Sequence, residues 1–421
     1  MLPGDVKGIN KFFCFSSIFL FSVFIFCFYS QHRFVAGDEA FYIMAGKLVF
    51  SDKLLYTDFF YPQMPYLAYF LGFFGSLTDF TWESSRLSAV LFSSGIALLI
   101  AEQVYQKSKK YLLAIISVMI FLLCDFVFEF FPIVKTYSYS VFFLLLAARF
   151  ILKNSKYSAL LAGLFFGISV GIRLQFAIAM LPILLFCWRK PNRNKTIPFL
   201  LGTSIGLLPV LITAINDFEA FWFNNIGYHQ LRNRVGLIGG FHQKISSLRN
   251  LVGYADQVGY VSWQFLVIFI AALIENLLRV FQKREFTLYF TIALSLFLVS
   301  LLPTPVYLQY FCVLVPFLVI DTTCLILRVL EDKNILLKFF TLACLLGYLC
   351  PFPQEFQRYT VTGKGVPGVY NRKNAQNWKV DNLEEIAKVI DVNLPEDHLV
   401  LSTWPGYLLG SKAKPVEGTE N

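Results

Sequence analysis

Residues 12–30 read FFCFSSIFLFSVFIFCFYS and contain no charged side chain. A run of about 20 apolar residues is long enough to cross the hydrocarbon core of a bilayer as a helix. Lys7 and Lys11 precede the run, and Phe34 stands two residues before Ala36, where a signal-peptidase site would need a small residue. We therefore expect an uncleaved first transmembrane helix.

Comparable apolar runs recur along all 421 residues, of which 57% are hydrophobic and 15% charged, against about 25% charged in soluble domains. The sequence thus predicts an all-α polytopic membrane protein with about eleven transmembrane helices. The net charge of +9 does not by itself indicate nucleic-acid binding, and we expect no nucleic-acid partner. The expected spans are residues 12–30, 85–105, 111–130, 137–152, 157–172, 174–188, 197–215, 258–279, 286–302, 306–328 and 337–351.

The connections between these spans predict the orientation of the chain. Short basic loops alternate with longer, less basic ones, and cytoplasmic loops carry the excess of Lys and Arg. We therefore expect a multi-pass protein of the plasma (inner) membrane with a cytoplasmic N-terminus. The first large loop (31–84), the second (216–257) and the tail then lie outside. Residues 62–77 are apolar but short and contain two prolines, so we expect them to re-enter without spanning.

The chain changes character towards its C-terminal end. We expect a transmembrane domain over 1–351 and an extracytoplasmic α/β tail over 352–421. Within the tail, DNLEEIAKVIDVNL (381–394) is typical of an amphipathic helix and HLVLST (398–403) of a short strand. These elements are too few for an independent core. The tail either packs on the membrane domain or is a shortened form of something longer.

The first outer loop carries the candidate catalytic residues. Asp38 and Glu39 open GDEAFYIMAGKL (37–48), and Asp58 precedes the prolines that return the chain to the membrane. Asp38 as a simple helix N-cap is the alternative interpretation. Acidic side chains walled by aromatic residues such as Tyr42 and Tyr61 are typical of a desolvated acid–base site.

The location of these acids suggests a reaction. Outside the cytoplasm there is no ATP, so an activated substrate must arrive attached to lipid, and a sugar on a polyprenyl phosphate fits. A carboxylate would deprotonate an acceptor hydroxyl that attacks and inverts the anomeric carbon, while cations or a metal stabilise the leaving phosphate. The alternatives are a transporter or lipid-linked glycan flippase without transferase chemistry, or an inactive scaffold.

Basic residues supply candidates for the phosphate. Arg173 lies between two apolar runs, where it either binds the lipid phosphate or extends its head to the interface. Arg86 is more typical of a structural anchor. In the 216–257 loop, Arg232 and Arg234 either bind the donor or lie on headgroups as part of an amphipathic helix. We expect Gln309 and Tyr310 to approach the pocket, with Tyr42 and Tyr61, from the opposite wall.

The arrangement of the first helix, the acidic outer loop and the re-entrant segment resembles that in the GT-C superfamily of integral-membrane glycosyltransferases, in particular the protein O-mannosyltransferase and aminoarabinose transferase group. The resemblance rests on GDEAFYIMAGKLV (37–49), LLYTDFFYPQMPYLAYFLGFFGSL (54–77) and ESSRLSAVLF (83–92). Looser matches are AGLFFGISVGIRLQF (162–176), VYLQYFCVLVPF (306–317) and the tail from 400 onwards.

This resemblance implies a polyprenyl-phosphate-sugar-dependent glycosyltransferase with Asp38 as general base. Glu39 and Asp58 correspond to positions that bind a divalent metal ion or orient the acceptor; no other cofactor is implied. The acceptor would be a lipid, a glycan or a protein. Aminoarabinose transferases carry Lys just before the re-entry proline, where this chain has Tyr61, and this difference favours a neutral sugar.

Overall fold

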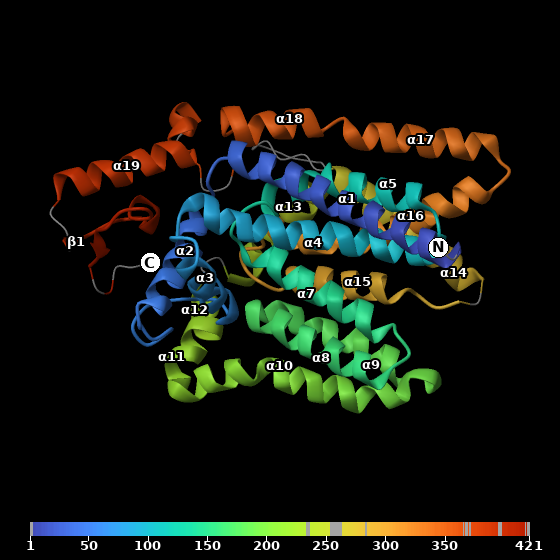
Figure 1. Ribbon diagram of the computed structural model, residues 1–421, viewed down its shortest axis with the longest axis horizontal. Helices are drawn as coiled ribbons and strands as arrows, with labels where there is room; N and C mark the ends of the chain where they lie inside the picture. Colours follow the sequence, from blue (N-terminus) through green and yellow to red (C-terminus); the bar gives the residue numbers. More distant parts are fainter. Residues whose placement is uncertain are drawn as a thin grey trace.

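The computed structural model describes residues 3–232, 236–252, 263–282, 284–364, 366, 369, 372–394, 398–416 and 418. Within these residues the chain is almost entirely helical, and long helices run side by side along the longest axis (Figure 1). The expected all-α polytopic fold is therefore confirmed. In the described part of the chain, six helices are long and apolar enough to cross a membrane, and six further apolar helices are shorter.

Within the described residues, each expected span is found as one helix or as two consecutive helices; residues 258–262 of the expected span 258–279 lie outside the described part of the chain. They are α1 (Pro3–His32), α4 (Trp82–Ser108), α5 with α6 (Tyr111–Leu122, Asp125–Phe130), α7 (Thr136–Ile151), α8 (Lys156–Ile172), η1 with α9 (Leu174–Ala179, Met180–Trp188), α10 (Thr196–Asn216), α14 (Trp263–Phe281), α15 (Leu288–Ser300), η4 with α16 (Leu308–Leu314, Val315–Glu331) and α17 (Ile335–Leu349).

The remaining elements, apart from η2 (Lys190–Lys195), connect or extend these helices at the end of the bundle opposite the start of α1. They are α2 (Gly37–Phe50), α3 (Tyr66–Ser76), α11 (Phe218–Trp222), η3 (Phe223–Gly227), α12 (Tyr228–Leu231), α13 (Gly236–Leu251), α18 (Phe352–Gln357), η5 (Arg358–Thr362), η6 (Arg372–Trp378), α19 (Val380–Asn393), β1 (Leu399–Val400), η7 (Pro405–Tyr407) and β2 (Lys414–Pro415). Strands β1 and β2 pair in parallel, with Leu399 opposite Lys414.

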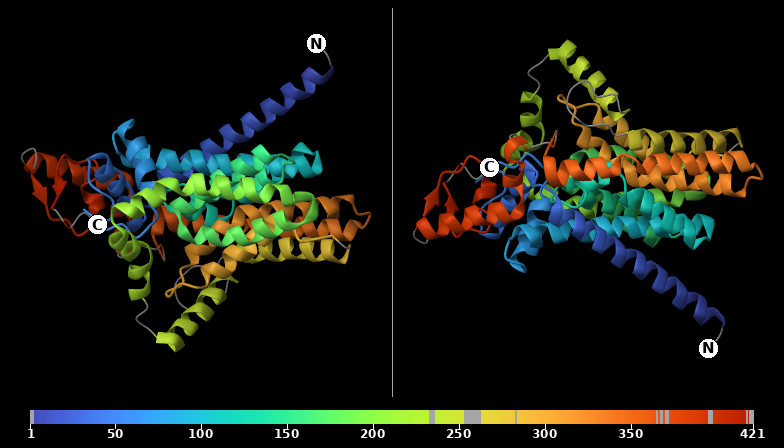
Figure 2. Two further views of the ribbon diagram at one scale, coloured as in Figure 1. Left: turned by 90° about the horizontal axis from the view of Figure 1, so that it is seen from below. Right: turned by 90° about the horizontal axis from the view of Figure 1, so that it is seen from above.

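The two ends of the bundle differ in what they carry. In Figure 1, α2, α3, α11, α12 and the tail elements gather at one end, and α1 begins at the opposite end. Figure 2 shows the same separation, with the first halves of α1 and α13 diverging from the bundle. The short basic connections, such as 106–111 and 189–195, join helices at the end where α1 begins. We refer to the end with α2, α3 and the tail as the outer end, following the positive-inside rule.

Helix α3 has the length expected of a re-entrant segment. Its 11 residues would span about 16 Å at a rise of about 1.5 Å per residue, roughly half of the hydrocarbon thickness of about 30 Å. It folds back against α2, and the two helices cross where Gly46 meets Gly72. A Cβ atom on Gly46 would lie 2.8 Å from the Leu71 Cβ, so this crossing requires glycine.

Helices α8 and α10 pack still more closely. Gly163 and Gly167 on α8 face Gly202 and Gly206 on α10, and a Cβ atom on Gly163 would collide with the carbonyl oxygen of Phe199. Small residues four apart let helix backbones approach each other in a membrane, where van der Waals contact drives association. This pairing positions the end of α8, where Arg173 follows.

The tail packs on the membrane domain. One hydrophobic core fills the bundle, and a second joins α2, α3 and the start of α4 to tail residues such as Leu383 and Leu408. The backbone N–H of Val35 donates to the Trp378 carbonyl at 2.7 Å, and the Trp404 Nε1–H donates to the Gly37 carbonyl at 2.8 Å. The tail therefore holds the chain immediately before Asp38.

Candidate active site

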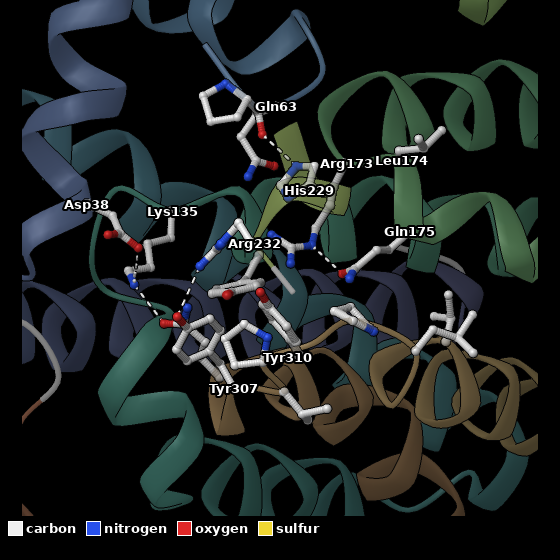
Figure 3. A pocket seen from close by; sticks show the side chains of 18 of the residues that line it. Asp38, Gln63, Lys135, Arg173, Leu174, Gln175, His229, Arg232, Tyr307 and Tyr310 are labelled. Carbon is white, nitrogen blue, oxygen red and sulfur yellow. Dashed lines mark hydrogen bonds and ion pairs between the residues drawn. The ribbon is translucent and has the colours of Figure 1, made fainter. Parts of the chain in front are cut away.

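A cavity of about 1690 Å³ opens at the outer end of the bundle, and Figure 3 shows part of its lining. Its walls come from the start of α2, the turn before α3, the segment from α6 to α7, the break between α8 and η1, the α12 region and the segment from α15 to η4. Segments far apart in the sequence therefore meet here. The cavity exceeds the 300–1,000 Å³ that is usual for a drug-sized ligand, so it has room for two substrates.

Asp38 lies in the first turn of α2 with its side chain directed at the cavity (Figure 3). The N-cap of α2 is Ala36, and the Glu39 carboxylate accepts from the Ala36 N–H at 2.8 Å. Asp38 instead accepts from Lys135, with 3.1 Å between Oδ2 and Nζ. The alternative interpretation of Asp38 as the N-cap of α2 is therefore wrong, because Ala36 occupies that position and Asp38 lies within the helix.

Lys135 connects two walls of the cavity. Lys135 is only 4% exposed. Its ammonium donates to Asp38 and, at 2.9 Å, to the Gln309 Oε1. The Asp38 side chain is 57% exposed because it faces the open cavity. The Lys135 ammonium is the main reason why the pKa of Asp38 lies below its usual value of 3.8, and Arg232 and Arg173 lower it further. Asp38 is thus ionised over the whole physiological range.

Arg173 stands at the break between α8 and η1, where its extended backbone turns the side chain into the cavity. It is 7% exposed and donates to the Thr136 hydroxyl at 2.8 Å and the Gln175 side chain at 2.9 Å. Its guanidinium lies 5.3 Å from the ring centre of Tyr310. No ion pair joins Arg173 to a carboxylate within the described residues, so its charge is available to a ligand.

Arg232 approaches the cavity from the end of α12. It donates to the Tyr307 hydroxyl at 3.0 Å and lies over the Tyr307 ring at 5.5 Å. Of the residues predicted to line the pocket, Tyr42, Gln309 and Tyr310 do so. Arg234, predicted beside Arg232, lies outside the described residues.

Glu39 faces away from the cavity. It is fully buried, and its carboxylate accepts two hydrogen bonds from Arg86, from Nε at 2.8 Å and from Nη2 at 2.7 Å. The same guanidinium donates to the Ser30 carbonyl at the end of α1. Arg86 is therefore the structural anchor that was expected, and the placement of Glu39 corrects its assignment to the catalytic or metal-binding group.

Asp58 and Tyr61 also do not line the cavity. The Asp58 carboxylate accepts from the Leu54 backbone N–H at 2.7 Å and so stabilises its own turn. Tyr61 is completely buried and stacks on Phe41, with ring centres 5.4 Å apart. We conclude that Tyr61 supports the wall behind the cavity, and that Asp58 is a turn-stabilising residue.

The acidic residues present do not fit a metal site. Glu39 is already paired with Arg86 and Asp58 with its own turn, so neither joins Asp38. The described residues contain no group of three or more His, Cys, Asp or Glu side chains placed to hold a metal ion. The expected involvement of Glu39 and Asp58 in metal binding is not supported by this donor set.

The cavity also contains residues that the sequence reasoning missed. Lys135 and Glu129 lie on either side of FFPIV (130–134), and both are at most 4% exposed. An ionisable residue inside an apolar stretch is usually functional, and this signal marks both positions. His229 reaches the cavity beside Arg232; its Nε2 lies 3.2 Å from the Pro62 carbonyl, and burial lowers its pKa from 6.5. The sequence placed His229 with Arg232 in a segment over the cavity, but it did not indicate the contact with Pro62.

The bundle and its outer loop have the fold of solved GT-C integral-membrane proteins. No family model matches the chain, and no curated protein matches it. Several solved structures, however, match the chain. ArnT from Cupriavidus metallidurans in the apo state has a TM-score of 0.67 at 12% identity, over 97% of this chain and 86% of that chain.

The same ArnT bound to undecaprenyl phosphate has a TM-score of 0.66 at 11% identity, over 95% of this chain and 85% of that one. An oligosaccharyltransferase from Archaeoglobus fulgidus, in complex with Zn and sulfate, has a TM-score of 0.54 at 13% identity, over 95% and 62% of the two chains. Both are GT-C proteins, and at these identities the likeness confirms the expected fold.

Proposed function

We propose that the protein is an inverting glycosyltransferase that moves a sugar from a polyprenyl-phosphate donor to an extracytoplasmic acceptor. The observation that carries the proposal is one cavity in which an ionised, half-exposed carboxylate, Asp38, faces two arginines. A general base and a phosphate site are the two requirements of such a transfer.

The apolar part of the cavity supports a lipid donor. Leu174, Ile178, Val299 and Leu302 line the side where η1 packs on α15, and Leu302 is 70% exposed. A polyprenyl chain could leave the cavity between these elements into the bilayer, while its phosphate stays inside. The ArnT structure with undecaprenyl phosphate shows that a protein of this fold binds such a lipid.

Each group in the cavity has a step in the proposed reaction. The Asp38 carboxylate accepts the proton of the acceptor hydroxyl as its oxygen attacks the anomeric carbon. The bond between that carbon and the phosphate oxygen breaks, and polyprenyl phosphate leaves with the bonding electron pair. Arg173 and Arg232 stabilise the charge that develops on the phosphate. Lys135 keeps Asp38 ionised and oriented.

The test uses the purified chain in lipid nanodiscs with polyprenyl-phosphate-linked mannose and glucose as separate donors. Release of polyprenyl phosphate is measured by ³¹P NMR in the presence of cell-envelope extract as acceptor. We expect release with at least one donor, and about 100-fold less in Asp38→Asn, as for the loss of a general base. Wild-type release by folded Asp38→Asn would refute the role of Asp38. Movement of the intact donor across the bilayer without release would instead favour a flippase.

A further inference from the structure

A second hollow, of about 580 Å³, lies on the tail between α19, η6 and η7. We call it the tail groove. One side is aromatic: the Trp378 and Trp404 ring centres are 5.0 Å apart, and the Tyr407 ring meets Trp404 edge-on at 5.2 Å. The aliphatic residues Leu383, Ile386, Val389 and Ile390 of α19 line the other side. Asn377, Asn382 and Glu385 supply polar groups at its rim. Its volume is within the range usual for ligand sites.

The tail groove differs from the main cavity in charge. The main cavity is lined by Lys135, Arg173 and Arg232, as an anionic donor requires. Among the residues that the structure describes, those that line the tail groove include no Lys, Arg or His. An anionic ligand such as a phosphate headgroup would therefore find no counter-charge in the tail groove. The combination of aromatic rings with amide and carboxylate groups suits a neutral sugar, whose C–H faces pack on rings and whose hydroxyls hydrogen-bond to the rim.

The tail groove and the main cavity share a wall. Trp404 donates to the carbonyl of Gly37, and Gly37 lines the main cavity beside Asp38. The Trp378 carbonyl accepts from Val35, two residues earlier. The tail lies beyond the outer end of the bundle (Figure 2), so a ligand in the tail groove is on the aqueous side of Asp38.

We propose that the tail groove binds a neutral saccharide chain whose end enters the main cavity as the acceptor. This proposal rests on the transferase function proposed above, and it names the acceptor class as a glycan rather than a lipid or a protein. A lipid acceptor would reach Asp38 from the bilayer and would not use a hollow on the tail. The tail groove offers no unpaired strand edge to a peptide, since its described lining comes from helices and the turn at Trp404 and Tyr407.

The variants are chosen so that the fold survives. The Asn377 and Glu385 side chains are exposed and have no hydrogen bond or ion pair within the described residues, so the double variant Asn377→Ala/Glu385→Ala removes only rim groups. Tyr407→Ala removes one ring while Trp404 keeps its bond to Gly37. Lys388→Ala is the matched control, because Lys388 lies on α19 but does not line the tail groove.

Binding is measured by saturation-transfer difference NMR on the full chain in nanodiscs, with cellotetraose, maltotetraose and chitotetraose as probes. We expect transfer to at least one tetrasaccharide, an affinity about tenfold weaker in Tyr407→Ala and in the double variant, and no change in Lys388→Ala. Absence of transfer to all three, unchanged binding in both groove variants, or displacement of the sugar by an extended Ser/Thr-rich peptide would overturn the proposal.

A second readout separates this proposal from the transferase function. Water is the acceptor in slow donor hydrolysis, so hydrolysis reports the main cavity without the tail groove. Donor hydrolysis without tetrasaccharide binding would overturn the proposed saccharide site in the tail groove but would leave the proposed transferase function intact. Tetrasaccharide binding without any turnover of donor would leave a saccharide site but overturn its role as an acceptor site.

Discussion

Neutralising the adjacent acids Asp38 and Glu39 should affect two different properties: Glu39→Gln should lower stability, and Asp38→Asn should lower turnover. In Glu39→Gln, Arg86 keeps its charge but loses its carboxylate partner and one of the two hydrogen bonds. Water cannot compensate, because residue 39 is fully buried and Arg86 is 1% exposed. Breaking a buried ion pair from one side costs about 3–5 kcal/mol, and the retained amide oxygen places the expected loss of unfolding free energy near 3 kcal/mol. Arg86 also links α1 to α2, so the loss affects the frame of the site.

Asp38→Asn should leave stability nearly unchanged. The Asp38 side chain is 57% exposed, and the Asn side chain keeps an oxygen that can accept from the buried Lys135 ammonium, so we expect a loss of no more than about 1 kcal/mol. Its effect should fall on turnover, with a loss of about 100-fold that corresponds to about 2.7 kcal/mol of transition-state stabilisation. The two variants therefore separate a structural acid from a chemical one.

The assay combines thermal unfolding in detergent with donor turnover, using Asp52→Asn as control because Asp52 is an exposed acid of the same loop. We expect Glu39→Gln to unfold several degrees earlier and to keep activity per folded molecule at low temperature. Asp38→Asn should unfold like wild type and be nearly inactive. The reasoning is refuted if Glu39→Gln is as stable as wild type but inactive, since Glu39 would then act in the chemistry.

Four further outcomes follow from the structure. Arg173→Met should weaken binding of the purified lipid-linked donor strongly, and Arg173→Lys should recover only part because Lys lacks the bidentate fork; unchanged donor affinity in Arg173→Met would contradict the phosphate role. Lys135→Met removes the main cause of the low pKa of Asp38, so the pKa rises and the ionised base is lost at a higher pH; the acid limb of the pH–rate profile should move upward, and an unmoved limb would count against the pairing. A cysteine at Ser51 on a Cys-free background should be labelled from outside, and labelling only from the cytoplasm would reverse the topology. Gly163→Leu should separate α8 from α10 and lower thermal stability, whereas a wild-type unfolding temperature would show that the contact is not tight.

The helices could be predicted from the sequence because lipid forces each spanning segment to satisfy its own backbone hydrogen bonds, and long apolar runs therefore mark helices directly. The site could be predicted only in part. Asp38 and Glu39 are neighbours in sequence, but successive residues on a helix do not face the same way. One therefore points into the cavity and the other towards Arg86. No local pattern distinguishes the two before the partner helix is known.

Lys135 was missed for a related reason. Its partners, Asp38 and Gln309, are 97 and 174 residues away, and only the packing of α7 against the outer loop and η4 brings them together. Asp58 was expected in the site because it precedes the re-entry prolines. Its carboxylate is instead used by the backbone four residues earlier. Local hydrogen bonds of this kind compete with long-range roles for short acidic side chains.

The glycine contact between α8 and α10 sets the depth at which the protein holds its arginine. Arg173 follows the last turn of α8, so its height relative to the lipid headgroups depends on how α8 is aligned along α10. In the observed alignment Gly163 packs on Phe199 and Thr203, and Gly167 packs on Thr203 and Gly206. A slip by one turn would carry Arg173 about 5 Å along the helix axis. The four glycines therefore fix the height of Arg173 within the protein, and in a bilayer of different thickness the proposed phosphate site would lie at a different depth relative to the headgroups.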